Sequence, residues 1–174
     1  MAQGDRDLDC AIIYEVYDNG NAQERFEYEL EQHLEAKRSH IIIEPSRLGD
    51  ETARWITVGN SLHKTSVITG FVSLLALPAA TRWKPANYIG YPMGAVSVIC
   101  AALYDVSWQF DPCCKYQVEY DAANLSRLPL HKLTSSTPVV LVRKDDKYRK
   151  AFHNLFAGIA LMYLAYRFYN WCGQ

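Results

Sequence analysis

The sequence lacks the short motifs that mark most enzymes. Its five histidines, at positions 33, 40, 63, 131 and 153, form no H-E-x-x-H pattern, and there is no G-x-S-x-G nucleophile loop and no Walker loop. We therefore assign no catalytic, cofactor-binding or metal-ligating residue. The sequence predicts a protein that is not an enzyme and that needs no cofactor.

Cysteine is scarce, and its spacing excludes two common uses. The five cysteines, at positions 10, 100, 113, 114 and 172, are odd in number and include no C-x-x-C pair. This pattern fits neither a secreted disulfide framework nor a zinc ribbon. The adjacent Cys113 and Cys114 cannot easily share one tetrahedral metal, so we expect them to be structural. Thiol modification, or a metal site with His131, is the alternative.

The N-terminus has no recognisable targeting signal. Residues 1–7 are acidic and have no apolar core, which argues against a secretory signal, and they lack the Arg-rich character of a transit peptide. Ala2 stands where N-myristoylation needs glycine. We therefore expect any membrane targeting to come from internal segments.

Acidic residues are absent from the middle of the chain. The overall net charge of -1 hides a division into residues 1–63 with net charge -7, residues 64–104 with +3 and no acid, and residues 105–174 with +3. This balance is not the strongly basic one of a nucleic-acid-binding domain, and we predict no nucleic-acid partner. The acidic first part and the nearly uncharged middle part must have different surroundings.

Two long uncharged runs fill the middle region, 17 residues between Lys64 and Arg82 and 20 residues between Lys84 and Asp105. At about 1.5 Å per residue, a helix of the second length covers a bilayer core of roughly 30 Å. We interpret residues 64–104 as a transmembrane helical hairpin with helices at about 65–81 and 85–104. The alternative is a buried hairpin in a soluble helical protein.

Charged and small residues in this region suggest specific roles. Lys64, Arg82 and Lys84 flank the two runs and are predicted to be topogenic, facing lipid headgroups. Small residues spaced by four positions predict close helix packing, which drives helix association in lipid. The predicted helix-packing residues are Ser66, Gly70, Gly90, Gly94, Ser97 and Ala101. For Gly90, relief of strain around the nearby Pro92 is an alternative role.

The flanks of the hairpin predict a small mixed head. Strands are predicted at residues 10–17, 40–44, 117–120 and 139–142, because these runs are apolar or alternating and rich in β-branched residues. One helix is predicted from an Asn21 cap with Glu24 to about Arg38, and another from an Asp50 cap. Because a hairpin returns the chain to its starting side, we expect strands from residues 1–63 and 105–150 to pair in one α/β head.

A third apolar segment follows the head. Residues 151–166 are 16 uncharged residues, about 24 Å of helix, with apolar side chains all around it. We expect residues 151–174 to form a membrane-associated helix that does not cross completely. The predicted fold class is thus an α+β membrane protein with a transmembrane helical hairpin, a small mixed α/β head and a C-terminal membrane-associated helix.

Three stretches resemble the mitochondrial transmembrane protein 11 family. They are residues 23–36 (QERFEYELEQHLEA), 41–67 (IIIEPSRLGDETARWITVGNSLHKTSV) and 107–146 (SWQFDPCCKYQVEYDAANLSRLPLHKLTSSTPVVLVRKDD). Together they cover nearly half of the chain, on both sides of the predicted hairpin. The resemblance implies a small multi-pass mitochondrial membrane protein required for mitochondrial morphogenesis and for the organisation of cristae and the inner membrane.

The resemblance also implies partners and a location. It implies the inner membrane, near the cristae-junction organising complex, with no catalytic residues; the alternative is the outer membrane, with mitophagy receptors. The small-residue spacing described above additionally predicts self-association. From the basic tip we expect the tip in the matrix and the head in the intermembrane space. Two rival functions remain, a membrane-embedded thiol-dependent enzyme using Cys113 or Cys114, and a small-solute channel, although no charge lies inside either run.

Overall fold

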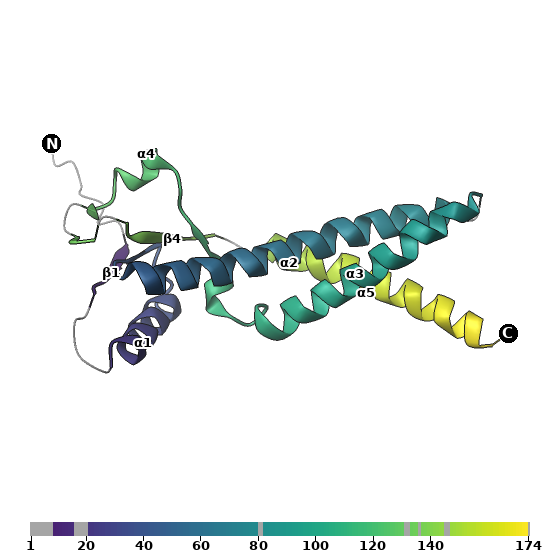
Figure 1. The fold of residues 1–174 in the computed structure, drawn as a ribbon, viewed down its shortest axis with the longest axis horizontal. Coiled ribbons are helices and arrows are strands. Elements are labelled where there is room, and N and C mark those ends of the chain that lie inside the picture. The colour runs from purple at the N-terminus through teal and green to yellow at the C-terminus, as the bar shows by residue number, and fades with distance from the viewer. Residues whose placement is uncertain are drawn as a thin grey trace. The chain divides into compact units, whose positions relative to one another are not determined.

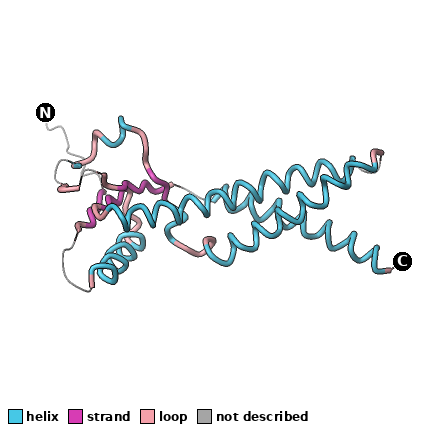
Figure 2. Tube along the Cα trace, in the orientation of Figure 1, coloured by secondary structure: helices cyan, strands magenta, loops and turns pink. Residues whose placement is uncertain are grey.

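The computed structural model describes residues 9–15, 21–79, 82–130, 133–135, 137–144 and 147–173. The chain forms two compact units (Figure 1). We call them the head unit, Met1–Thr57 with Pro112–Asp145, and the helical unit, Val58–Asp111 with Asp146–Gln174. The long helix α2, Ser46–Ala79, contributes residues to both. The prediction of a mixed α+β protein is confirmed, with mostly helices and one small sheet (Figure 2).

The sheet of the head unit joins segments from both sides of the apolar runs. Its strands are β1 (Cys10–Ile13), β2 (His40–Ile43), β3 (Tyr116–Val118) and β4 (Val139–Arg143), in the spatial order β1-β2-β4-β3. Strands β1 and β2 are parallel, and the other pairs are antiparallel, with Ile42 opposite Val140. The predicted pairing of early strands with late strands is therefore confirmed.

The core of the head unit lies on both faces of the central strand β2. Ile41, Ile42 and Ile43 are fully buried, as expected for a β-branched run covered on two sides. One face packs against helix α1 (Ala22–Glu35), whose buried stripe is Phe26, Leu30 and Leu34. On the other face, Ile42 and its cross-strand neighbour Val140 form a cluster with Leu128. The remaining short elements of this unit are the 3-10 helix η2 (Pro112–Lys115) and helix α4 (Ala122–Leu125).

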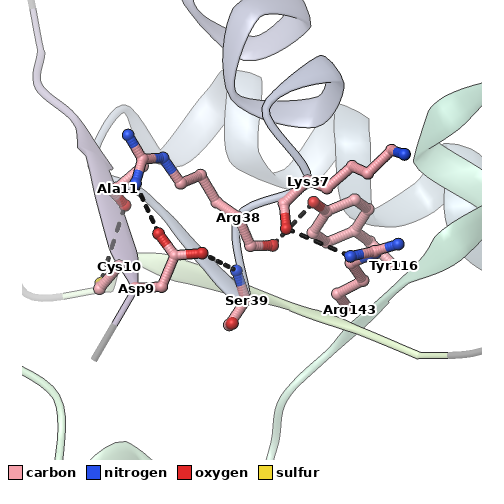
Figure 3. Close-up of polar contacts among 8 residues, drawn as sticks. All are labelled: Asp9, Cys10, Ala11, Lys37, Arg38, Ser39, Tyr116 and Arg143. Atoms are coloured by element: carbon pink, nitrogen blue, oxygen red, sulfur yellow. Dashed lines mark hydrogen bonds and ion pairs between the residues drawn. The ribbon is translucent and has the colours of Figure 1, made fainter. Parts of the chain in front are cut away.

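A left-handed residue ends α1. Lys37 has φ 56°, and the backbone N–H groups of Lys37 and Arg38 donate to the carbonyls of Leu34 (3.1 Å) and His33 (3.3 Å). This is the Schellman arrangement, in which glycine usually takes the left-handed position. Neighbouring elements fix the turn (Figure 3): Tyr116 Oη donates to the Arg38 carbonyl at 2.8 Å, and Arg38 Nη1 donates to Asp9 Oδ1 at 2.6 Å.

A buried carboxylate closes the other end of β2. Glu44 is 4% exposed, and its Oε1 accepts hydrogen bonds from the backbone N–H groups of Thr134 (2.6 Å) and Ser135 (3.3 Å). Its Oε2 accepts from the N–H of Glu15 at 3.2 Å. These bonds, that of Thr134 above all, hold the pKa of Glu44 below its usual value, although burial acts in the opposite direction. The carboxylate thus ties two loops to the end of the sheet.

Asn21 is the N-cap residue of α1, as predicted, although its side chain makes no cap bond. Two local expectations in the head unit are wrong. Asp50 lies inside α2, which begins at Ser46, directly after Pro45. The first strand ends at Ile13, not at residue 17, and residues 16–20 lie outside the described part of the chain. The first turn of α2 packs closely on the sheet at Gly49, whose Cβ position lies 3.0 Å from Val139 and 3.3 Å from Ile43. Tertiary packing of this turn on the sheet overrides the local cap signal.

The helical unit consists of residues 58–79 of α2, the 3-10 helix η1 (Lys84–Ala86), α3 (Asn87–Ser107) and α5 (Lys147–Cys172). The predicted helix at 65–81 is the second half of one continuous helix, with Pro78 near its end. The predicted helix at 85–104 corresponds to η1 and α3. Helix α5 has 26 residues, ten more than the uncharged run that predicted it, because charged and aromatic residues extend it at both ends.

Candidate functional site: the helix interface of the helical unit

Three fully buried serines join α2 to α3. Ser66 Oγ donates to the carbonyl of Ser97 at 3.1 Å, and Ser97 Oγ donates to the carbonyl of Ser66 at 2.8 Å. Ser73 Oγ donates to the carbonyl of Gly90 at 2.9 Å. All three serines have zero exposure. A hydroxyl that bonds a neighbouring backbone brings two helices close together without leaving a polar group unpaired.

Glycines make this close approach possible. A Cβ at Gly70 would lie 2.8 Å from Ser97 Oγ, and a Cβ at Gly94 would lie 2.8 Å from Ser73 Oγ. These distances are shorter than side-chain contacts allow. Because the pairing of Ser66 with Ser97 is followed by that of Ser73 with Gly90, residue numbers rise on α2 as they fall on α3.

Helix α5 packs on the same surface. The Cβ positions of Gly70 and Gly94 lie 3.4 Å from Phe156 and from Leu164, respectively. Farther along, Arg167 Nε donates to Tyr91 Oη at 2.7 Å, and the guanidinium lies 5.7 Å from the centre of that ring. Helix α5 therefore accompanies α3 along most of its length.

A buried polar cluster closes one end of the interface. His63 Nδ1 and His153 Nδ1 are 3.3 Å apart, and the two rings stack with their centres 5.2 Å apart. The ring of Tyr104 lies 4.8 Å from that of His153, and both residues are 1% exposed. His153 Nε2 is 3.5 Å from Asp105 Oδ1, and the Arg149 guanidinium lies over Tyr104 at 5.7 Å. One Nδ1 must carry the proton that the other accepts, so the cluster links α2, α3 and α5 most favourably when at least one of the two histidines is neutral.

The predicted site residues fall into two sets. The six helix-packing residues, Ser66, Gly70, Gly90, Gly94, Ser97 and Ala101, are all buried, and the contacts above bring the first five of them together. Ala101 lies farther along α3, where it faces Ala157 and Gly158 of α5. The three predicted topogenic cations, Lys64, Arg82 and Lys84, are exposed.

The sequence reasoning missed Ser73 and the histidine cluster. Ser73 follows Gly70 by three positions and Ser66 by seven, so extending the small-residue row by one step would have found it. His63 and His153 are 90 positions apart, and nothing local marks them as a pair. In the described residues, no group of three or more His, Cys, Asp or Glu side chains is placed to hold a metal ion.

The outer surface of the helical unit is apolar. Large hydrophobic side chains that are about half exposed or more include Ile68, Phe71 and Leu75 on α2, Ile99, Leu103 and Val106 on α3, and Leu155, Leu161 and Met162 on α5. Meanwhile serines fill the interior. In a water-soluble helical domain these positions are normally reversed.

One helix of the described chain, Lys84–Ser107, is long and apolar enough to cross a membrane. It contains 24 residues and corresponds to the second predicted span. Residues 65–79 and α5 do not reach the same standard of length and composition.

The cysteines offer no obvious chemical site. None of the five, all of which lie in the described ranges, is in a disulfide. Cys114 is 6% exposed, and Cys113 packs against the core of the head unit. His131, the proposed metal partner, lies outside the described residues.

Fold and surface together define the class, a small α+β protein with a membrane-type helical unit. The chain belongs to the mitochondrial morphogenesis regulator family, whose model matches residues 9–169. This confirms the resemblance found in the sequence. The chain is thus a mitochondrial membrane protein of a family named for regulating mitochondrial morphogenesis.

The similar proteins share one name and most of their length. The chain is 61% identical over 162 residues to "Transmembrane protein 11, mitochondrial" of Homo sapiens, which covers 93% of this chain and 84% of the relative. It is 60% identical over 164 residues to that of Bos taurus (94% and 85%), and 60% identical over 162 residues to that of Danio rerio (93% and 86%). No solved structure matches the chain.

Proposed function

We propose that this protein shapes mitochondria without catalysis, as a multi-pass protein of the inner membrane that organises cristae through protein contacts. The observation that carries the proposal is the reversed polarity of the helical unit, in which Ser66, Ser73 and Ser97 are inside and large apolar side chains outside. Such a surface is stable when hydrocarbon surrounds it, while the buried hydroxyls bond to backbone carbonyls.

The same distribution supports a transmembrane hairpin of α2 and α3, with α5 beside them. Although α2 is less apolar than α3, its buried serines Ser66 and Ser73 bond to α3, and Ile68, Phe71 and Leu75 face outward. Because α5 accompanies α3 from Asp105 to Tyr91, we extend the proposal to a third membrane helix that ends on the side of the tip, at Arg82–Lys84. The tip faces the matrix, and the head unit faces the intermembrane space.

Partners would then bind the surfaces that are not buried in contacts within the chain. The glycines and serines of the interface are occupied within the chain, so self-association uses the outer apolar faces of the helices. The head unit presents Glu27, Glu31 and Glu35 on the exposed face of α1, which suits a basic partner segment. The cristae-junction organising complex is the proposed partner; in the outer membrane, mitophagy receptors would take its place.

Topology can be tested with tags at Met1 and Gln174 and a cysteine at Trp83, in a chain whose native cysteines are serines. In intact mitochondria, external protease should spare both tags. After rupture of the outer membrane, protease should digest the Met1 tag but not the Gln174 tag. The tip cysteine should not react with a membrane-impermeant thiol reagent until the inner membrane is also opened. A Met1 tag that is digested in intact mitochondria would place the protein in the outer membrane.

Function can be tested by rescue in cells that lack the protein. The wild-type chain should restore mitochondrial shape and cristae, and so should the double variant Cys113→Ser/Cys114→Ser, because no thiol chemistry is involved. Gly94→Ile should insert into the membrane but fail to rescue, since its side chain would displace Ser73 and Leu164. Loss of rescue by a stably folded double serine variant would favour the thiol enzyme instead.

A further inference from the structure

A groove between α3 and α5 has an apolar body and a polar end. Its volume is about 350 Å³, within the roughly 300–1,000 Å³ of small-molecule sites. Small residues on the two helices, Ala101, Ala102, Ala157 and Gly158, form its body. Nothing lies within 4 Å of the position that a Cβ of Gly158 would occupy, so the groove is open there.

The polar end is rich in hydrogen-bond acceptors. Asp105, Gln109 and Asn154 line it. Asp105 Oδ1 is buried beside His153, yet the Asp105 side chain is 43% exposed, so the carboxylate also reaches the groove. Gln109 Oε1 is buried and accepts no hydrogen bond within the part of the chain that the structure describes. The last turn of α3 has no basic residue, so its carbonyl dipoles add further negative potential.

A cation lies next to these acceptors. Lys150 Nζ donates to the backbone carbonyl of Gln109 at 2.9 Å, and Lys150 precedes Asn154 by one helical turn. At this end of the groove, Lys150 is therefore bonded to the backbone of one lining residue, Gln109, while another lining residue, Asp105, supplies a carboxylate. A zwitterionic ligand matches these charges, if its ammonium group donates hydrogen bonds to Asp105 and its anionic group lies toward Lys150.

The groove also matches the depth of a lipid. Its polar end lies where the candidate span Lys84–Ser107 finishes, and Val98 and Leu161 mark its other end, farther into the apolar part of both helices. The headgroup of a phospholipid lies at the end of a membrane helix, and its acyl chain runs along the helix toward the centre of the bilayer.

We infer that this groove binds a phospholipid with a primary-amine headgroup, of the phosphatidylethanolamine type. The headgroup ammonium donates to Asp105 and Asn154, the phosphate lies toward Lys150, and an acyl chain lies over Ala101, Ala157 and Gly158. A choline headgroup has the same charge but no N–H to donate, so the acceptors discriminate between the two lipids. This inference rests on the proposed membrane location of the helical unit.

The test compares phosphatidylethanolamine with phosphatidylcholine of identical acyl chains. The full chain is reconstituted in vesicles that contain the two lipids equally, extracted in mild detergent and analysed by native mass spectrometry. The wild-type protein should retain the amine lipid about tenfold over the choline lipid, the ratio expected for one charge-assisted hydrogen bond. Equal retention of the two lipids by protein that has entered the vesicles overturns the inference.

Two variants separate the parts of the site. Gly158→Leu places its Cβ in open space, directs its side chain into the groove and should abolish retention of both lipids. Asp105→Asn keeps the shape and should retain lipid with no preference for the amine. Val106→Leu, on an 85% exposed side chain outside the groove, is the matched control and should behave as the wild type.

The remaining outcomes are also decisive. If Gly158→Leu changes a protein dimer and not the bound lipid, the groove is an interface between copies and the lipid inference is wrong. If the wild-type chain never enters the vesicles, the proposed membrane function itself fails, which is distinguishable from a failure of lipid selectivity.

Discussion

Two residues of the head unit have a conformation or an environment that is unusual for their residue type. Lys37 takes a left-handed conformation that usually belongs to glycine, and Glu44 is buried as a hydrogen-bonded carboxylate. Both close a turn or a loop through atoms distant in sequence. The sequence predicted helix α1 and strand β2 around them, but it could not predict these contacts. Tyr116, which bonds the Arg38 carbonyl in the turn at Lys37, follows Arg38 by 78 positions, and Thr134 follows Glu44 by 90 positions.

The strain at Lys37 gives a first prediction. Lys37→Gly should stabilise the head unit by roughly 1 kcal/mol, because a left-handed backbone is unfavourable for residues with a Cβ. Lys37→Ala removes the same side chain but keeps the Cβ, so it should give no such gain. Thermal unfolding of the two variants checks this, and equal melting temperatures would contradict it.

The buried carboxylate gives a second prediction. Glu44→Gln should destabilise the protein at pH 7 by about 2 kcal/mol, because its amide group would point a donor at a backbone N–H. Since the pKa of Glu44 is lower in the folded state, its charge stabilises the protein at pH values above the pKa of the unfolded state. That pKa is the ordinary glutamate value of about 4.3.

This stabilisation disappears as the pH falls through the folded pKa, so wild type and Glu44→Gln should converge in acid. Thermal unfolding from pH 7 to pH 3 measures the difference. The exposed Glu31 is the control, and Glu31→Gln should change little at any pH. A constant gap between wild type and Glu44→Gln across this range would show that the charge is not responsible.

At the scale of elements, small residues that can be recognised in the sequence mark the faces on which α2 and α3 pack together. The four-residue spacing predicted the buried positions of Ser66, Gly70, Gly94 and Ser97, because helix periodicity alone fixes which residues share a face. It could not show that α5 covers the same surface. The charge-free runs also hid the continuity of α2, since its first turns pack on a sheet that is completed only by later residues.

Two glycines test this packing with the same substitution. A Cβ at Gly59 would lie 2.5 Å from Trp108 Cδ1, whereas a Cβ at Gly158 meets nothing within 4 Å. Gly59→Ala should therefore destabilise the protein by roughly 1–3 kcal/mol through overpacking against a buried indole. Gly158→Ala should leave stability unchanged or slightly higher, because alanine favours helix. Thermal unfolding in detergent compares them, and equal effects would be inconsistent with the packing described.

At the scale of the whole molecule, the head unit depends on two segments that α2 and α3 separate in the chain, Met1–Thr57 and Pro112–Asp145. Deletion of residues 117–142 removes most of β3 and of β4, so the N-terminal half should become sensitive to protease, since isolated short strands are unstable. Limited proteolysis with an N-terminal tag measures this. Residues 1–63 produced alone should be digested as fast as the deletion variant. A protease-resistant fragment would show that β1, α1 and β2 fold by themselves.

The pairing of β2 with β4 also sets an order in time. His40 faces Val142, and the whole of α2 and α3 lies between them in the chain. During synthesis or import, the isoleucines of β2 stay exposed until β4 becomes available, after more than half of the chain has followed. Contacts between such distant residues form slowly. The sheet of the head unit is therefore completed only after α2 and α3 have been made, so its formation is a late step relative to both helices.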